Sequence, residues 1–123
     1  MPEIPKPIPL VFWKSATGRE PVREWLSELS REDKRTIGRD IAKVQFGWPI
    51  GLPLCRPLSG GLWEVRSSLP SMREARVFFG FHDDTLIALH ALIKKGRKAP
   101  AADLAVARQR LKEIKSWQEK TRT

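Results

Sequence analysis

The sequence has one cysteine, two histidines and no tyrosine among its 123 residues. Cys55 has no second thiol with which to form an internal disulfide, so the composition fits a reducing compartment, and we expect a cytoplasmic protein with a packed, unreactive thiol. His82 and His90 do not belong to an HxxxH pattern, and the chain has no CxxC motif or acidic pair at ligand spacing. We therefore expect no metal site and no cofactor.

Long hydrophobic runs and nucleotide-binding loops are also missing. No apolar run approaches the roughly 18 residues of a membrane span, and the segment MPEIPKPIPL has no hydrophobic signal core. No GxGxxG or Walker loop is present, and no serine lies in a nucleophile-elbow motif. We expect neither membrane insertion nor export.

Acidic residues are the minority charge, with 14 Asp and Glu against 23 Lys and Arg. Residues 1–55 hold nine basic and seven acidic residues, whereas residues 56–123 hold fourteen and seven. The excess positive charge is therefore concentrated in the second part of the chain. This distribution indicates an anionic partner there, either nucleic acid or an acidic protein.

The patterns along the chain predict a single α+β domain over residues 1–123, with an extended proline-rich arm at 1–8 and a frayed tail at 118–123. We expect a small, mostly antiparallel sheet packed against a helical hairpin, with the helices on one face and the order β-α-α-β-β-β-α. The expected strands are 10–13, 62–66, 73–81 and 85–93; the expected helices are 21–29, 30–44 and 99–117; residues 47–61 form a Pro- and Gly-rich connection.

Three details of these elements are specific enough to test. Ser30 is the expected N-cap of the second helix, with Asp33 completing a variant of the capping box. In strand 73–81, alternation separates Val77, Phe79 and Phe81 from Arg76, Phe78 and Gly80. Strand 85–93 is apolar on both faces apart from His90, so it is the expected central strand.

Basic residues gather on and just beyond the last three strands: Arg66, Arg73, Arg76, Lys94, Lys95, Arg97 and Lys98. Guanidinium and ammonium groups bind phosphate oxygens, and they stabilise the transition state of phosphate cleavage without a metal ion. With RNA as substrate, the 2′-hydroxyl is the available nucleophile, and cleavage leaves a 2′,3′-cyclic phosphate and a 5′-hydroxyl.

The general acid and base remain open between His90, Glu64 and a lysine whose cationic neighbours favour the neutral amine. His90 has an alternative role as a hydrogen-bonded core residue. Glu64 has an alternative role as an ion-pair partner that positions Arg66 or Arg76.

Three segments, RPLSGGLWEVRSS, REARVFFGF and LHALIKKGRKAPAADLAVARQRLKE, resemble the RelE/ParE superfamily of bacterial toxins and most of all its HigB-like, phage-derived branch. The resemblance covers residues 8–115 and implies the same order of helices and strands. It also implies the toxin of a type II toxin–antitoxin module, acting as a metal-independent endoribonuclease on messenger RNA in the ribosome. The absence of tyrosine departs from RelE-type enzymes and favours the HigB-like version.

Carried over position by position, the resemblance implies catalytic roles for Arg66, Arg76, His90, Lys94 and Lys95. Arg73, Arg97 and Lys98 are the expected RNA-binding residues. The implied partners are mRNA, the ribosome and a cognate antitoxin of the helix-turn-helix type, with a toxin–antitoxin heterotetramer as one implied assembly. Two alternatives stay open: a ParE-like inhibitor of DNA gyrase that acts by protein–protein contact, and a non-catalytic basic module that binds nucleic acid.

Overall fold

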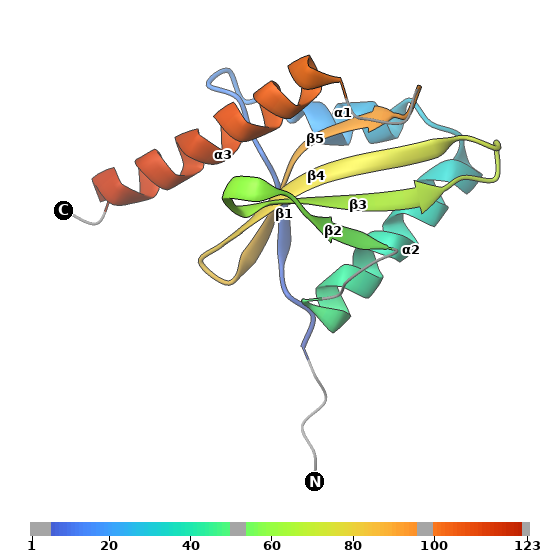
Figure 1. Cartoon of the computed structure of the whole chain (residues 1–123), viewed down its shortest axis with the longest axis horizontal. Coiled ribbons are helices and arrows are strands. Elements are labelled where there is room, and N and C mark those ends of the chain that lie inside the picture. The colour runs from blue at the N-terminus through green and yellow to red at the C-terminus, as the bar shows by residue number, and fades with distance from the viewer. Residues whose placement is uncertain (1–5, 50–53, 96–99, 122–123) are drawn as a thin grey trace, which may run out of the picture.

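The computed structural model describes residues 6–49, 54–95 and 100–121, which form an α+β fold with five strands and three α-helices (Figure 1). The elements are β1 (Leu10–Phe12), α1 (Pro21–Ser27), α2 (Arg31–Gly47), β2 (Cys55–Pro57), the 3-10 turn η1 (Ser59–Gly61), β3 (Leu62–Ser68), β4 (Glu74–His82), β5 (Thr85–Ile93) and α3 (Ala101–Thr121). The predicted order is confirmed, with one correction. β2 lies in the segment that the sequence assigns to an irregular connection.

The strands form one sheet in the order β1-β5-β4-β3-β2. β1 pairs with β5 in parallel, and the other neighbouring pairs are antiparallel. The expectation of a mostly antiparallel sheet is therefore confirmed. β5 is an interior strand, as its apolar sequence predicts, but the central position belongs to β4. Both edge strands, β1 and β2, are three residues long.

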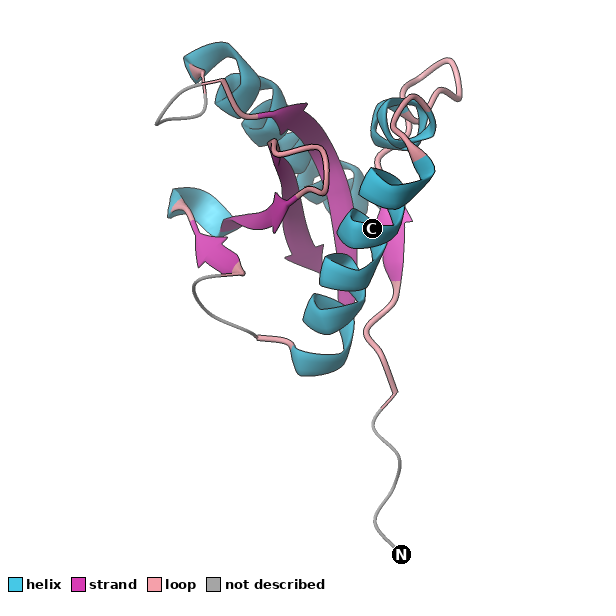
Figure 2. Ribbon diagram, turned by 90° about the vertical axis from the view of Figure 1, so that its right-hand side faces the viewer, coloured by secondary structure: helices cyan, strands magenta, loops and turns pink. Residues whose placement is uncertain are grey.

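Helices cover both faces of the sheet, so the expectation of helices on one face is wrong (Figure 2). Alternation along β4 provides an apolar surface on each side. Val77 and Phe79 pack with the hairpin of α1 and α2, whereas Phe78 packs with Ala107 and Leu111 of α3. The predicted separation of these side chains is confirmed. Alternation alone does not assign a helix to each face, and the apolar stripe of α3 needs a surface of its own.

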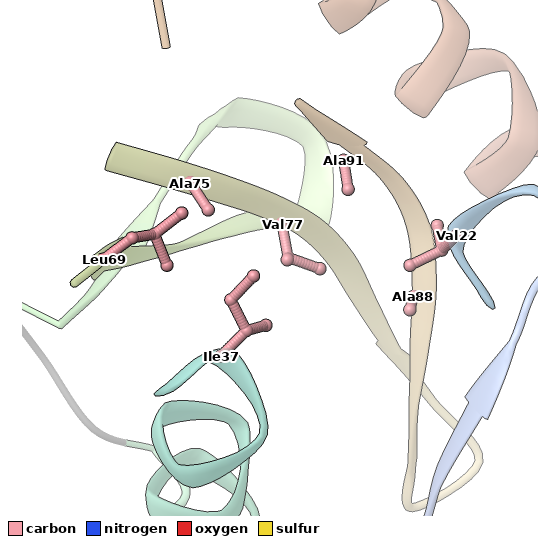
Figure 3. Close-up of a cluster of buried hydrophobic side chains, with 7 residues drawn as sticks. All are labelled: Val22, Ile37, Leu69, Ala75, Val77, Ala88 and Ala91. Atoms are coloured by element: carbon pink, nitrogen blue, oxygen red, sulfur yellow. The ribbon is translucent and has the colours of Figure 1, made fainter. Parts of the chain in front are cut away.

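The core beneath the hairpin joins both of its helices to β4 and β5. Val22 of α1, Ile37 of α2, Val77 and Ala88 are almost completely buried there. Figure 3 shows Ile37 directed from α2 toward Val77, and Val22 beside Ala88. Burial of a Val or Ile side chain contributes about 1.5–3 kcal/mol, so these contacts fix the hairpin on its side of the sheet.

On the other face, α3 lies close to β4 at Gly80. A Cβ atom at this position would lie 2.5 Å from Cδ1 of Leu111, too short for two non-bonded carbons. Leu111 is itself buried among apolar neighbours, so it has little room to move away. Glycine at this strand position allows the helix to approach the sheet.

The start of α2 is fixed by two side chains. Ser30 Oγ accepts a hydrogen bond from the backbone N–H of Asp33, at 3.2 Å, so the predicted N-cap is confirmed. The Asp33 carboxylate does not complete a capping box. It accepts hydrogen bonds from the Ser71 backbone N–H at 3.3 Å, the Ser71 hydroxyl at 2.8 Å and the Arg73 guanidinium at 3.3 Å. The helix is therefore bonded to the turn between β3 and β4.

The ends of the described chain differ slightly from expectation. Within the predicted arm, the Ile8 backbone N–H donates to the Gln45 carbonyl, and the Gln45 side-chain amide donates to the Ile8 carbonyl, both at 2.9 Å. α3 continues to Thr121 and includes residues 118–121, which the sequence assigns to a frayed tail. None of the helices in the described ranges combines the length and the apolar character needed to cross a membrane.

Candidate nucleic-acid interface

The sheet face that packs on α3 becomes charged beyond its apolar part. Alternation places Glu64 and Arg66 of β3 on this face, and the register pairs Arg66 with Arg76 of β4. The neighbouring strands add Arg56, opposite Glu64, and His90, opposite Phe78. We call the following set the charged face: Arg56, Glu64, Arg66, Glu74, Arg76, His90 and Lys94.

Glu64 is the acidic centre of the charged face. Its Oε1 accepts a hydrogen bond from Arg66 Nε at 2.7 Å, and its Oε2 accepts one from Arg76 Nη1 at 3.4 Å. The Glu64 side chain is only 3% exposed, so its charge is compensated by the two guanidinium groups rather than by water. The sequence leaves two roles open for Glu64, a general acid or base and an ion-pair partner. This geometry supports the ion-pair partner, which positions both Arg66 and Arg76.

Arg76 is ion-paired on two sides. Its Nε donates to Glu74 Oε2 at 3.2 Å, in addition to the contact with Glu64, and its side chain is 4% exposed. The Lys94 ammonium also lies 3.5 Å from Glu74 Oε2. The buried guanidinium of Arg76 is therefore part of the framework of the charged face, and two of its three nitrogens already donate to carboxylates.

The cations that solvent reaches surround this framework. The Arg66 side chain is 29% exposed and that of Lys94 is 32% exposed. Arg56 and Lys95 are exposed, and neither makes an ion pair within the part of the chain that the structure describes. These four side chains can reach an anion, whereas Arg76 orients Glu64, which holds Arg66.

A β-bulge in β5 determines which way His90 points. The register pairs Phe79 with Ala88 but Phe78 with His90, so Leu89 is the extra residue. Leu89 packs with the α3 side of the sheet, and His90 follows it onto the same face. The Leu89 carbonyl accepts a hydrogen bond from Arg110 Nη1 of α3, at 2.7 Å. The bulge is thus held by the helix that it faces.

His90 lies between a carboxylate and an aromatic ring. Its Nε2 is 2.6 Å from Oδ1 of Asp103, in the first turn of α3. Its ring is stacked on Phe78, with a centroid distance of 6.3 Å and an interplanar angle of 19°. The side chain is 20% exposed, so the hydrogen-bonded ring is still within reach of solvent.

Arg73 is the one predicted RNA-binding residue that the structure describes, and it lies away from the charged face. Arg73 is in the turn between β3 and β4, where it donates to Asp33 and Ser71 beside the start of α2. The structure therefore does not bring Arg73 together with the charged face. Arg97 and Lys98 lie outside the described residues.

The structure also bears on two other chemistries, a reactive thiol and a metal site. Burial raises the pKa of the Cys55 thiol to about 11, with a smaller contribution from the charge of Glu64, so this thiol stays protonated at neutral pH. The expected packed, unreactive role is consistent with this. Within the described ranges, no group of three or more His, Cys, Asp or Glu side chains has an arrangement that could hold a metal ion.

A groove of about 800 Å³ lies between β1, the turn after β4 and α3. Its walls are largely apolar and include Val11, Trp13, Ile87 and Ile114. None of the residues of the charged face lines it, so it is separate from the candidate interface.

Sequence reasoning did not identify Arg56 or Asp103 as residues of this site. Arg56 stands next to Pro57 in a stretch rich in prolines and glycines, where no strand alternation can be assigned. Asp103 is an acidic residue in the first turn of a helix. This arrangement is common, and the favourable interaction with the helix dipole explains it without any role in a site. A signal for its second role was the short spacing of thirteen residues from His90, across a strand-to-helix connection.

Comparison with known proteins supports one family. The sequence model of the family described as Phage derived protein Gp49-like (DUF891) matches residues 24–112, well over half of the chain. No curated protein matches the sequence significantly. The matched range extends from α1 into α3 and includes the whole charged face. The chain belongs to the phage-derived Gp49-like family, a family of RelE/HigB-like toxins.

Proposed function

We propose that this protein is the toxin of a type II toxin–antitoxin module and that it cuts messenger RNA on the ribosome without a metal ion. The observation that carries the proposal is that Arg66, Lys94 and His90 share one sheet face, with two cations and one titratable ring within reach of solvent. Membership in a family of RelE/HigB-like toxins supports it. Such a toxin acts in the cytoplasm, where translation takes place.

The proposed reaction is an attack of the RNA 2′-hydroxyl on the adjacent phosphorus. His90 takes the hydroxyl proton, the bond from O2′ to phosphorus forms, and the bond from phosphorus to O5′ breaks. The ammonium group of Lys94 or Lys95 gives a proton to O5′. The products are a 2′,3′-cyclic phosphate and a 5′-hydroxyl.

The cations stabilise the negative charge that develops on the phosphate oxygens. Arg66 is suited to this role because its Nε is fixed by Glu64 while part of its guanidinium is exposed. Arg56 and Lys95 add positive charge along the RNA backbone. Arg76 acts indirectly, because it fixes the second oxygen of Glu64.

The experiment is brief expression of the protein in bacteria, followed by sequencing of RNA 5′ ends. We expect cuts inside translated regions, in register with codons and bearing 5′-hydroxyl groups. Arg66→Ala should lower cleavage by roughly 10²–10³-fold, as does loss of a group that stabilises the transition state. Arg19→Ala is the matched control, since Arg19 is a largely exposed arginine that pairs with Glu24 far from the charged face.

Other outcomes assign other functions. Intact transcripts together with an SOS response would support a ParE-like inhibitor of DNA gyrase. Salt-dependent RNA binding without cuts on translating ribosomes would support a non-catalytic binding module. Equal cleavage by the wild type and by Arg66→Ala would contradict the proposed role of the charged face.

The proposal includes an antitoxin of the helix-turn-helix type, encoded beside the toxin gene. Coexpression with a short neighbouring reading frame should suppress growth arrest and yield a stable complex, and its mass tests the heterotetramer. Failure of every neighbouring frame to protect the cell would argue against a module of this type.

A further inference from the structure

We propose that Asp103 is a positioning residue that holds His90 with the proton on Nε2 and leaves Nδ1 as the nitrogen that accepts the 2′-hydroxyl proton. This inference rests on the proposed function and assigns a role to a residue outside the predicted site. It depends on three structural features: the Asp103 contact, the stacking on Phe78 and the bulge.

The contact between Asp103 and His90 joins two elements. Asp103 lies in the first turn of α3, where its backbone N–H donates to the Pro100 carbonyl at 3.0 Å. Its Oδ1 is 2.6 Å from His90 Nε2 in β5, short for a hydrogen bond and typical of one with an ionised partner. The carboxylate is therefore placed by the helix and the imidazole by the strand.

The short contact selects one tautomer. An ionised carboxylate only accepts hydrogen bonds, whereas a neutral imidazole has one N–H donor and one nitrogen acceptor. The Asp103 carboxylate therefore favours the form in which Nε2 carries the proton. Nδ1 then keeps its lone pair, and it has no hydrogen-bond partner among the described residues. Only this nitrogen of the neutral ring can accept a proton from a substrate.

The ring is also fixed in its plane. His90 lies almost parallel to the fully buried ring of Phe78, its opposite neighbour in the β4–β5 ladder. With one ring nitrogen bound to Asp103, the direction of Nδ1 is set. A base that is oriented before the substrate arrives avoids the cost of ordering it in the transition state.

The bulge connects this arrangement to the charged face. Its extra residue, Leu89, is bonded through its carbonyl to Arg110, so α3 contacts the same bulge through Arg110 and through Asp103. Arg76 is the diagonal neighbour of His90 across the β4–β5 ladder, at a Cα separation of roughly 7–8 Å for such a pair. Arg76 belongs to the framework that holds Arg66 through Glu64, so the base lies beside the ion-paired network of the charged face.

The first measurement is the tautomer of His90 in the full-length protein, from the ¹⁵N shifts of histidine-labelled samples at alkaline pH. We expect His90 to carry its proton on Nε2 in the wild type. Asp103→Asn should reduce this preference, because an amide can either donate or accept. If Asp103 had only a structural role, His90 would not need to carry its proton on Nε2. A proton on Nδ1 in the wild type would overturn the inference.

The second measurement is mRNA cleavage on programmed ribosomes. Asp103→Asn should lower kcat by roughly 10- to 100-fold, a part of the 10²–10⁴-fold that general-base catalysis supplies, with little change in KM. Asp103→Glu should restore part of kcat. In the His90→Asn background, Asp103→Asn should have no further effect, because the two residues act together. Glu113→Gln, on the same helix, is the matched control.

The outcomes separate the inference from the proposed function. If the wild type leaves mRNA intact, the proposed function and the inference both fail. If the wild type cuts mRNA and Asp103→Asn cuts it at the same rate, the inference alone fails. An additive effect of the two substitutions would likewise show that Asp103 does not act through His90.

Discussion

Arg66 and Arg76 lie directly opposite each other in the β3–β4 ladder, on the same face of the sheet. Like charges in this arrangement repel each other, and they destabilise a sheet unless they are compensated. Here Glu64 bonds to both guanidinium groups and Glu74 bonds to one of them. The pairing of the two arginines therefore depends on a carboxylate that is almost completely buried.

Glu64→Gln should destabilise the protein strongly. The amide keeps the size of the side chain but removes the negative charge, which leaves Arg76 buried with one carboxylate partner. Loss of one partner from a buried ion pair typically costs about 3–5 kcal/mol, which we expect as a lower midpoint in urea unfolding. Glu24→Gln breaks an exposed pair with Arg19 and should cost less than about 1 kcal/mol. Similar midpoints for the two variants would show that the buried pair is not critical.

Arg66→Ala and Arg76→Ala should have different effects. Arg66 is partly exposed, so its loss should abolish most activity and should lower the urea midpoint less than loss of Arg76, because Glu64 keeps Arg76 as a partner. Arg76 is buried between two glutamates, so its loss should lower stability by several kcal/mol and should lower activity through the fold. Unfolding curves measured beside cleavage assays separate these effects. The distinction would be lost if Arg76→Ala were as stable as the wild type and inactive.

The stability of the protein should depend on Asp33 at acidic pH. Hydrogen bonds from Ser71, with a further contribution from Arg73, lower the pKa of Asp33 although burial opposes them. A carboxyl with a lowered folded-state pKa stabilises the fold above its unfolded-state pKa of about 3.9. This contribution is lost as the pH falls through the lower folded-state value.

The test for Asp33 compares urea unfolding of the wild type and of Asp33→Asn between about pH 5 and about pH 2. The variant should be less stable at the upper end, and the gap should narrow toward the acidic end. A constant difference across this range would mean that the charge of Asp33 does not contribute to stability.

Gly80→Ala should destabilise the packing of α3 on the sheet. The new methyl group would meet Leu111 at a distance that requires one of the two to move, and overpacking of this kind costs about 1–3 kcal/mol. Leu111→Ala creates a cavity next to Gly80 and is destabilising alone. The double variant should therefore be more stable than the sum of the two single effects predicts, as measured by a thermal or urea double-mutant cycle. If the stability losses of the two single variants simply add in the double variant, the new methyl group of Gly80→Ala does not clash with Leu111.

The fold is largely predictable from the sequence because its signals are local. Val77, Phe78 and Phe79 alternate over a long strand, and Ser30 stands at the start of a regular apolar stripe. Parts that depend on tertiary structure are not predictable in this way. The sequence contains no local sign that α3 crosses to the other face, and β2 is hidden by the prolines around Arg56.

The candidate site is less predictable because its geometry depends on one inserted residue. Strict alternation would place His90 on the face of Leu86 and Ala88, toward the hairpin of α1 and α2. The extra residue at Leu89 moves His90 to the face of Arg66 and Arg76. Burial of Arg76 is equally hidden in the sequence. The alternation of residues along a strand is the same whether the arginine faces a helix or faces solvent.

The two short outer strands of the sheet affect how the protein can associate with other chains. A sheet border exposes unpaired backbone donors and acceptors, and long borders promote uncontrolled joining of molecules through added strands. With only three residues in β1 and three in β2, each border has few such groups. Each of these outer strands therefore presents little backbone template for the addition of a strand from another molecule.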